Sequence, residues 1–237
     1  MIKQRIFESK ETLYEALQMD ISRDLIDACE AHDEALFLAS GGSSPSPVYR
    51  ALSTEELPWP HISVALVDER WVDIKHKGSN EALLNHNLLQ NAAVDATAYG
   101  MKNSGATAKQ GWQACEEHYA ALPWKGAVAL LGMGPDGHTA SLFPEAEGLD
   151  HALTTSNYVA PLMAKQSVVT GELTERMTLT LTALTKCKTL YLLITGEEKL
   201  QVFKRALEDA QGDGPYPLVI SHLLASTDIN LQVFWAP

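Results

Sequence analysis

The sequence lacks the features that mark secreted, metal-stapled and membrane proteins. Its only three cysteines, Cys29, Cys115 and Cys187, lie far apart, have no zinc-like spacing and are too few for a disulfide scaffold. We therefore expect reduced, buried thiols in a cytoplasmic protein. No apolar run approaches the ~18 residues that a membrane-spanning helix needs. The first segment, MIKQRIFESKETLYEA, turns charged and helical where a signal peptide would stay apolar.

Positive charge is also scarce. Among 237 residues, 18 Lys and Arg stand against 30 Asp and Glu, which gives a net charge of −12. This balance argues against nucleic-acid or anionic-membrane partners, although a few local cations could still hold an anionic small molecule. With 46% hydrophobic residues the chain is too apolar for disorder. No repeat, low-complexity tract or long linker divides it, so we expect one domain over residues 1–237.

Short apolar runs alternate with amphipathic stretches along the chain. The runs cover residues 35–40, 62–67, 127–131, 189–194 and 231–235. Helices are predicted for residues 11–31, 79–89, 106–121 and 197–209. The prediction of the first helix is based on an apolar stripe at four-residue spacing, formed by Leu13, Leu17, Ile21, Leu25 and Cys29. The alternation predicts an α/β fold with a mostly parallel, Rossmann-like sheet and helices on both faces.

Ligands of such sheets bind beyond the carboxyl ends of the strands, so the loops after residues 40, 67, 131 and 195 are expected to converge on one site. In the first loop, the glycines of Gly41-Gly42-Ser43-Ser44-Pro45 let the backbone approach a ligand. The two serine hydroxyls and the helix predicted to follow favour phosphate, although a tight strand-to-helix turn would select the same residues. No Gly-Lys-Ser/Thr follows, which excludes a Walker A loop.

The second loop carries Asp68-Glu69-Arg70 directly after a predicted strand. Arg70 could grip a phosphate through two hydrogen bonds, with an acidic neighbour holding its guanidinium. A surface ion-pair cluster is the alternative.

The third loop reads Gly132-Met133-Gly134-Pro135-Asp136-Gly137-His138. It matches GxGxxG formally, but it lies mid-chain and lacks the acidic strand end that a dinucleotide site has about 20 residues later. His138 is the better candidate, because a histidine is a usable base near neutral pH and this one is presented at the end of a strand.

Two further cations, Arg176 and Lys199, follow in the last third of the chain, and each could equally be a solvated surface charge. The other histidines show no HExxH or metal-triad spacing, so no metal site is predicted.

Together these segments resemble the 6-phosphogluconolactonase family, within the glucosamine-6-phosphate isomerase/6-phosphogluconolactonase superfamily. The matching segments, in family order, are Gly41 to Pro45, Asp68-Glu69-Arg70, Ser79-Asn80, Gly132 to Pro144, Glu175 to Thr180, and Thr195-Gly196 with Lys199. The DGHTASLFP segment is the most specific of them. Ser44 replaces the usual threonine, and residues 170–174 replace a proline-rich approach to Glu175-Arg176.

The resemblance implies a fold similar to glucosamine-6-phosphate deaminase and ribose-5-phosphate isomerase. It also implies hydrolysis of 6-phosphoglucono-1,5-lactone in the oxidative pentose phosphate pathway, by a monomer without metal or organic cofactor. His138 would be the base, oriented by Asp68 or Asp136. Gly41, Gly42, Ser43, Ser44, Arg70, Arg176 and Lys199 would bind the phosphate or the sugar-acid carboxylate.

Two rivals share this scaffold. The deaminase continues its Asp-Gly-His motif with a glutamate, where this chain has Phe143. Amine release needs an acid–base pair around the sugar, so the phenylalanine favours the lactonase. A sugar-phosphate sensor would not need His138 and would carry a DNA-binding segment, for which we find no room.

Overall fold

The computed structural model describes residues 1–212 and 214–237, and its main element is a seven-stranded sheet with the strand order β1-β10-β9-β6-β2-β3-β5. Every neighbouring pair is parallel. The strands are β1 (Ile2–Ile6), β2 (Ala35–Ala39), β3 (Ile62–Leu66), β5 (Thr97–Tyr99), β6 (Val128–Gly132), β9 (Thr189–Thr195) and β10 (Leu231–Ala236). The central strands are buried along almost their whole length, as continuous apolar runs require. The predicted parallel α/β sheet is confirmed.

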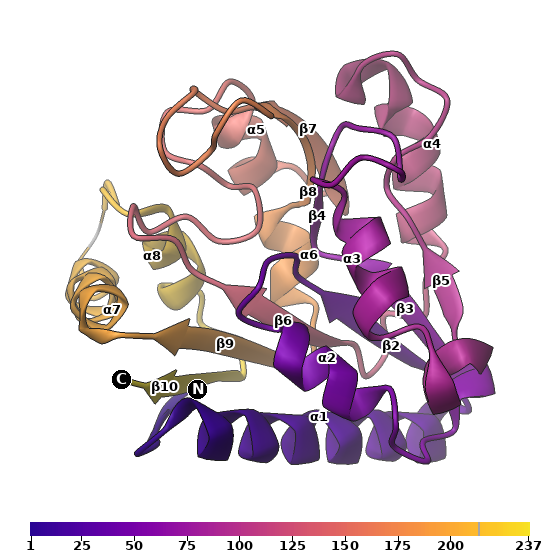
Figure 1. Cartoon of the computed structure of the whole chain (residues 1–237). Coiled ribbons are helices and arrows are strands. Elements are labelled where there is room, and N and C mark those ends of the chain that lie inside the picture. The colour runs from indigo at the N-terminus through magenta and orange to yellow at the C-terminus, as the bar shows by residue number, and fades with distance from the viewer. Residues whose placement is uncertain (213) are drawn as a thin grey trace.

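Helices pack on both sides of this sheet. They are α1 (Lys10–His32), α2 (Ser46–Leu52), α3 (Asn80–Asn87), α4 (Ala108–Ala120), α5 (Leu149–Thr154), α6 (Leu181–Thr185), α7 (Glu197–Asp209) and α8 (Val219–Leu224), with two 3-10 turns, η1 (Trp59–His61) and η2 (Asn91–Asp95). Figure 1 shows α1 along one side of the sheet, and α4, α5 and α6 on the opposite side.

The predicted stripe of α1 holds for four of its five residues. Leu13, Leu17, Ile21 and Leu25 are fully buried, but Cys29 is only half-buried and Ala28 takes the core position. Four residues turn a helix by 400°, so a stripe at strict four-residue spacing drifts around the helix until a step of three restores it. The expectation of three buried thiols is therefore correct for Cys115 and Cys187 and wrong for Cys29.

Two regions differ from the sequence-based prediction. Residues 2–6 form the edge strand β1, whereas we expected a helical N-terminus. Residues 68–70, expected as a loop, form β4 (Asp68–Arg70) in a second sheet. This sheet has the antiparallel order β4-β8-β7, with β7 (Val159–Met163) and β8 (Glu175–Leu179). No helix among the described residues is long and apolar enough to cross a bilayer.

Candidate active site

One cavity of about 320 Å³ lies where the chain leaves the carboxyl ends of β2, β3, β6 and β9. The predicted convergence of the four segments that follow these strands is confirmed. Nine of the ten predicted site residues line the cavity, namely Gly41, Gly42, Ser43, Ser44, Asp68, Arg70, His138, Arg176 and Lys199. The tenth, Asp136, contacts His138.

Asp136 holds the His138 ring. Its Oδ1 lies 2.5 Å from Nδ1 of the imidazole and also accepts the backbone N–H of His138 at 3.2 Å. Burial would raise the pKa of the Asp136 carboxyl, but the hydrogen bond and the charge of His138 outweigh burial and lower it. The ring packs so closely on Gly134 that a Cβ there would lie 2.1 Å from it, which explains the glycine.

Asp68 was the other candidate to orient the imidazole, and it is held by different partners. Its Oδ2 accepts the Ser141 hydroxyl at 2.5 Å, and its backbone carbonyl accepts the Asn80 amide at 2.8 Å. Asp68 lines the same cavity, but it is Asp136 that contacts the His138 ring.

Arg70 is positioned by polar groups other than its acidic neighbours. Its Nη1 donates to the Gly78 carbonyl at 2.7 Å and to Asn80 Oδ1 at 3.3 Å. Glu69, which we expected as one possible partner of the guanidinium, instead accepts the Arg70 backbone N–H at 2.8 Å. Its fully buried carboxylate also accepts Asn80 N, Glu81 N and Ser79 Oγ, so it ties β4 to the start of α3.

Arg176 and Lys199 complete the positive lining. Arg176 is only 3% exposed, its Nη2 donates to the Thr170 carbonyl, and its Nε is buried without a partner. Burial lowers the pKa of Arg176 to about 10, although Asp68 opposes this, and burial also lowers the pKa of Lys199. Within residues 1–212 and 214–237, no carboxylate lies within ion-pair distance of Arg70, Arg176 or Lys199.

The glycine loop, Gly41 to Pro45, is fixed by the residue that precedes it. Ser40 donates through its hydroxyl to the Leu130 carbonyl at 2.6 Å, and its own carbonyl accepts the Tyr49 hydroxyl at 2.6 Å. A Cβ at Gly41 would lie 1.9 Å from Asn80 Oδ1. Only glycine therefore lets this loop lie so close to Asn80, and both residues line the cavity.

Two of the cavity residues that were absent from the predicted site, Asn80 and Phe143, contact its charged side chains. Asn80 links Asp68 to Arg70, and the Phe143 ring packs on His138 with a centroid distance of 4.2 Å. Both lie in segments that carry the family resemblance, Ser79-Asn80 and Leu142-Phe143-Pro144. Their place in these segments was the only sign in the sequence that they belong to the site. An amide and an aromatic ring do not by themselves indicate a role.

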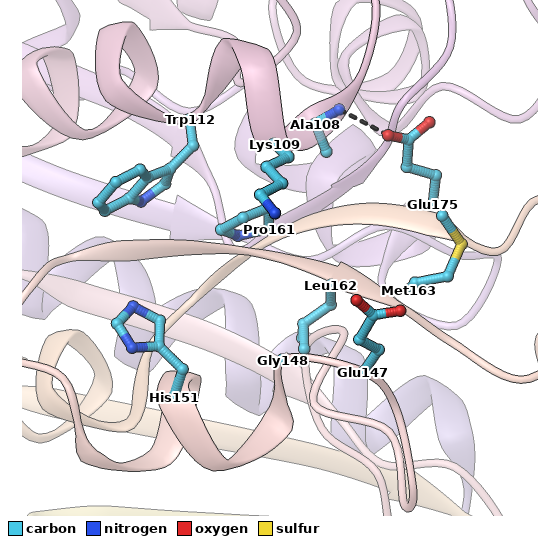
Figure 2. A pocket seen from close by; sticks show the side chains of 10 residues that line it. All are labelled: Ala108, Lys109, Trp112, Glu147, Gly148, His151, Pro161, Leu162, Met163 and Glu175. Atoms are coloured by element: carbon cyan, nitrogen blue, oxygen red, sulfur yellow. Dashed lines mark hydrogen bonds between the residues drawn. The ribbon is translucent and has the colours of Figure 1, made fainter.

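A second cavity of about 350 Å³ lies between α4, α5 and β7. Figure 2 shows its mainly apolar wall, with Trp112, Pro161 and Leu162, and the Glu175 carboxylate that accepts the Ala108 N–H at 2.7 Å. It contains none of the predicted site residues. Glu175 lines this cavity and Arg176 lines the first, so neighbouring residues of β8 serve different cavities.

Comparison with known proteins gives a consistent result. A family model described as glucosamine-6-phosphate isomerases/6-phosphogluconolactonase matches residues 8–227. The chain is 36% identical over 234 residues to a 6-phosphogluconolactonase of Rhizobium meliloti, covering 98% of this chain and 97% of that protein. A solved 6-phosphogluconolactonase from Shewanella baltica superposes with a TM-score of 0.93 at 33% identity, covering 100% and 98% of the two chains.

The predicted likeness to the deaminase fold is also confirmed. A monomeric glucosamine-6-phosphate deaminase superposes with a TM-score of 0.76 at 17% identity, covering 98% of this chain and 96% of that one. The likeness at this identity concerns the fold alone. On the family match and the close relatives, the chain belongs to the glucosamine-6-phosphate isomerase/6-phosphogluconolactonase family.

Proposed function

We propose that this protein hydrolyses 6-phosphoglucono-1,5-lactone to 6-phosphogluconate, a step of the oxidative pentose phosphate pathway. The observation that carries the proposal is the His138–Asp136 pair beside three cations that have no ion-pair partner among the described residues. Relatives named 6-phosphogluconolactonase, which match nearly the whole chain, support the same substrate. We further propose a cytoplasmic monomer that uses no metal.

In this mechanism the phosphate is anchored by the glycine loop and by cations drawn from Arg70, Arg176 and Lys199. Anchoring holds C1 of the lactone near His138 and turns binding energy into orientation. Because Asp136 occupies Nδ1, Nε2 of His138 is the nitrogen that takes a proton as water attacks C1. The tetrahedral intermediate then breaks its bond from C1 to the ring oxygen, and His138 returns the proton to that oxygen.

The charge that develops on the carbonyl oxygen needs donors placed in advance. Backbone N–H groups of the glycine loop or a guanidinium can supply them, since both line the cavity. A lactone is an activated ester, so one base and such donors suffice. The deaminase reaction would need a second acid–base group, and Phe143 stands at that position.

The decisive experiment follows the disappearance of freshly made lactone against its spontaneous rate, with chelator present. Wild type should accelerate the reaction, and His138→Ala should lower kcat by about 10²- to 10⁴-fold with little change in KM. Arg70→Ala, the comparison variant, should mainly raise KM. Near-normal turnover by His138→Ala would refute the role of the base. No acceleration by wild type would redirect the assay to glucosamine 6-phosphate.

A further inference from the structure

Phe143 contacts two of the groups of the site that carry or acquire positive charge, His138 and Arg176. Its ring centroid is 4.2 Å from that of His138, with an angle of 36° between the planes, and 5.6 Å from Cζ of Arg176. The residue is 5% exposed and lines the cavity. A packing role alone would not require an aromatic ring at this position.

The contacts of the imidazole restrict how it can sit. Asp136 engages Nδ1, the backbone at Gly134 lies against the ring, and Phe143 packs against the ring in a tilted stack. Nε2 is the ring nitrogen that these contacts leave for a water molecule. When His138 takes a proton it becomes an imidazolium, and the electron-rich face of an aromatic ring stabilises a cation.

We propose that Phe143 is a positioning residue that acts through His138: its ring fixes the imidazole and stabilises the imidazolium formed during the reaction. The inference rests on the proposed function in taking His138 as the base. The charged side chains that contact His138 or line its cavity are Asp136, Asp68, Arg70, Arg176 and Lys199. Three of these five are cations that oppose the imidazolium, and Phe143 offsets them at close range.

The test compares Phe143→Leu, which removes the ring but keeps apolar bulk, with Phe143→Tyr, which keeps it. Phe234→Leu is the matched control, because this fully buried ring in β10 also lies under an arginine, with Cζ of Arg5 at 4.5 Å from its centroid. Phe143→Met serves if the leucine variant does not fold. Two quantities are measured: kcat and KM for the lactone, and the midpoint of the His138 ring titration by NMR without substrate.

In Phe143→Leu we expect kcat to fall about 3- to 30-fold with KM nearly unchanged, and the NMR midpoint to fall by about half a pH unit to one unit. Phe143→Tyr should keep the wild-type midpoint, because it keeps the ring, and Phe234→Leu should match wild type in both measurements. An unchanged midpoint in both ring-less variants would overturn the proposal, whatever their activity. A shifted midpoint in a protein without lactonase activity would uphold the contact with the imidazole while refuting the proposed function.

Discussion

At the scale of single residues, Arg176 shows that a binding site can lower the stability of the folded protein. The guanidinium is almost closed to water, Nε has no partner, and burial lowers the pKa of Arg176 to about 10. A base whose pKa falls on folding is charged less readily in the folded state than in the unfolded one. Arg176 therefore lowers stability at neutral pH, and this penalty begins to fade only when the pH rises through about 10 and the folded state loses the proton first. A bound anion would supply the missing partner.

Arg176→Met should therefore raise the stability of the protein and weaken its binding of the lactone. We expect the free energy of unfolding at pH 7 to rise by about 1–4 kcal/mol, because an apolar side chain of similar length replaces a buried charge. The gain should narrow only as the pH rises above about 10, and KM for the lactone should rise. Denaturant unfolding at pH 7 and at about pH 10.5 measures the first effect. Arg205→Met, an exposed arginine of α7, should change neither quantity. A less stable Arg176→Met variant would contradict this explanation.

The sequence predicted nine of the residues that line the cavity because they lie near the ends of strands or the starts of helices, where backbone geometry and polar chemistry coincide. It left open whether Asp68 or Asp136 contacts His138, since that depends on how the loop turns between Asp136 and His138. It also missed Asn80 and Phe143. Asn80 contacts Arg70, and Phe143 contacts His138. These contacts join segments that are apart in the sequence or depend on how a loop turns, so spacing along the chain does not reveal them.

At the scale of elements, the joint between β4 and α3 positions the cavity wall. The carboxylate of Glu69 accepts hydrogen bonds from Arg70 N, Asn80 N, Glu81 N and Ser79 Oγ. Desolvation raises the pKa of Glu69, although these hydrogen bonds oppose the change. Asp-Glu-Arg is too short and too charged to be predicted as a strand. It pairs with β8 because the Glu69 side chain finds all its partners inside the protein.

Glu69→Gln should loosen this joint. The amide that replaces one oxygen is a donor facing donors, so we expect a loss of about 1–3 kcal/mol in the free energy of unfolding. KM should rise as well, because the Arg70 backbone and Asn80 lose their anchor. Glu116→Gln is a suitable control: its carboxylate accepts Tyr158 N and Val159 N between α4 and β7, away from the cavity. That variant should lose stability without a change in KM. Equal KM in the two variants would show that the joint does not position the site.

At the scale of the whole molecule, the strands that lead into the cavity are different from the edge strand, which contributes to stability alone. β9, β6, β2 and β3 are adjacent and lead into the cavity, while β1 lies at the far edge and pairs only with β10. Phe7, just after β1, stacks on Phe234 with centroids 5.4 Å apart, and its N–H bonds to the Trp235 carbonyl. The edge thus contributes packing and no cavity-lining side chain.

Phe7→Ala should lower the melting temperature without changing the kinetics. Losing this half-buried ring should cost about 1–2 kcal/mol, which corresponds to about 2–8 °C in a chain of this size. Both kcat and KM should stay within about twofold of wild type. Thermal unfolding and the lactone assay, both on the same preparation, check the two expectations. A large loss of kcat in a fully folded variant would contradict them, because it would show that packing at the sheet edge affects the cavity.

The pairing of β1 with β10 also bears on incomplete chains. Ile2 lies opposite Leu231, whereas all ten predicted site residues precede residue 200. A chain that ends between residues 200 and 230, through stalled synthesis or proteolysis, would contain every one of those site residues and still lack β10. Its β1 would have no partner, and β9, an apolar strand buried along nearly all its length, would become an open edge. Such edges recruit other chains, so we expect fragments of this kind to aggregate rather than to act as smaller enzymes.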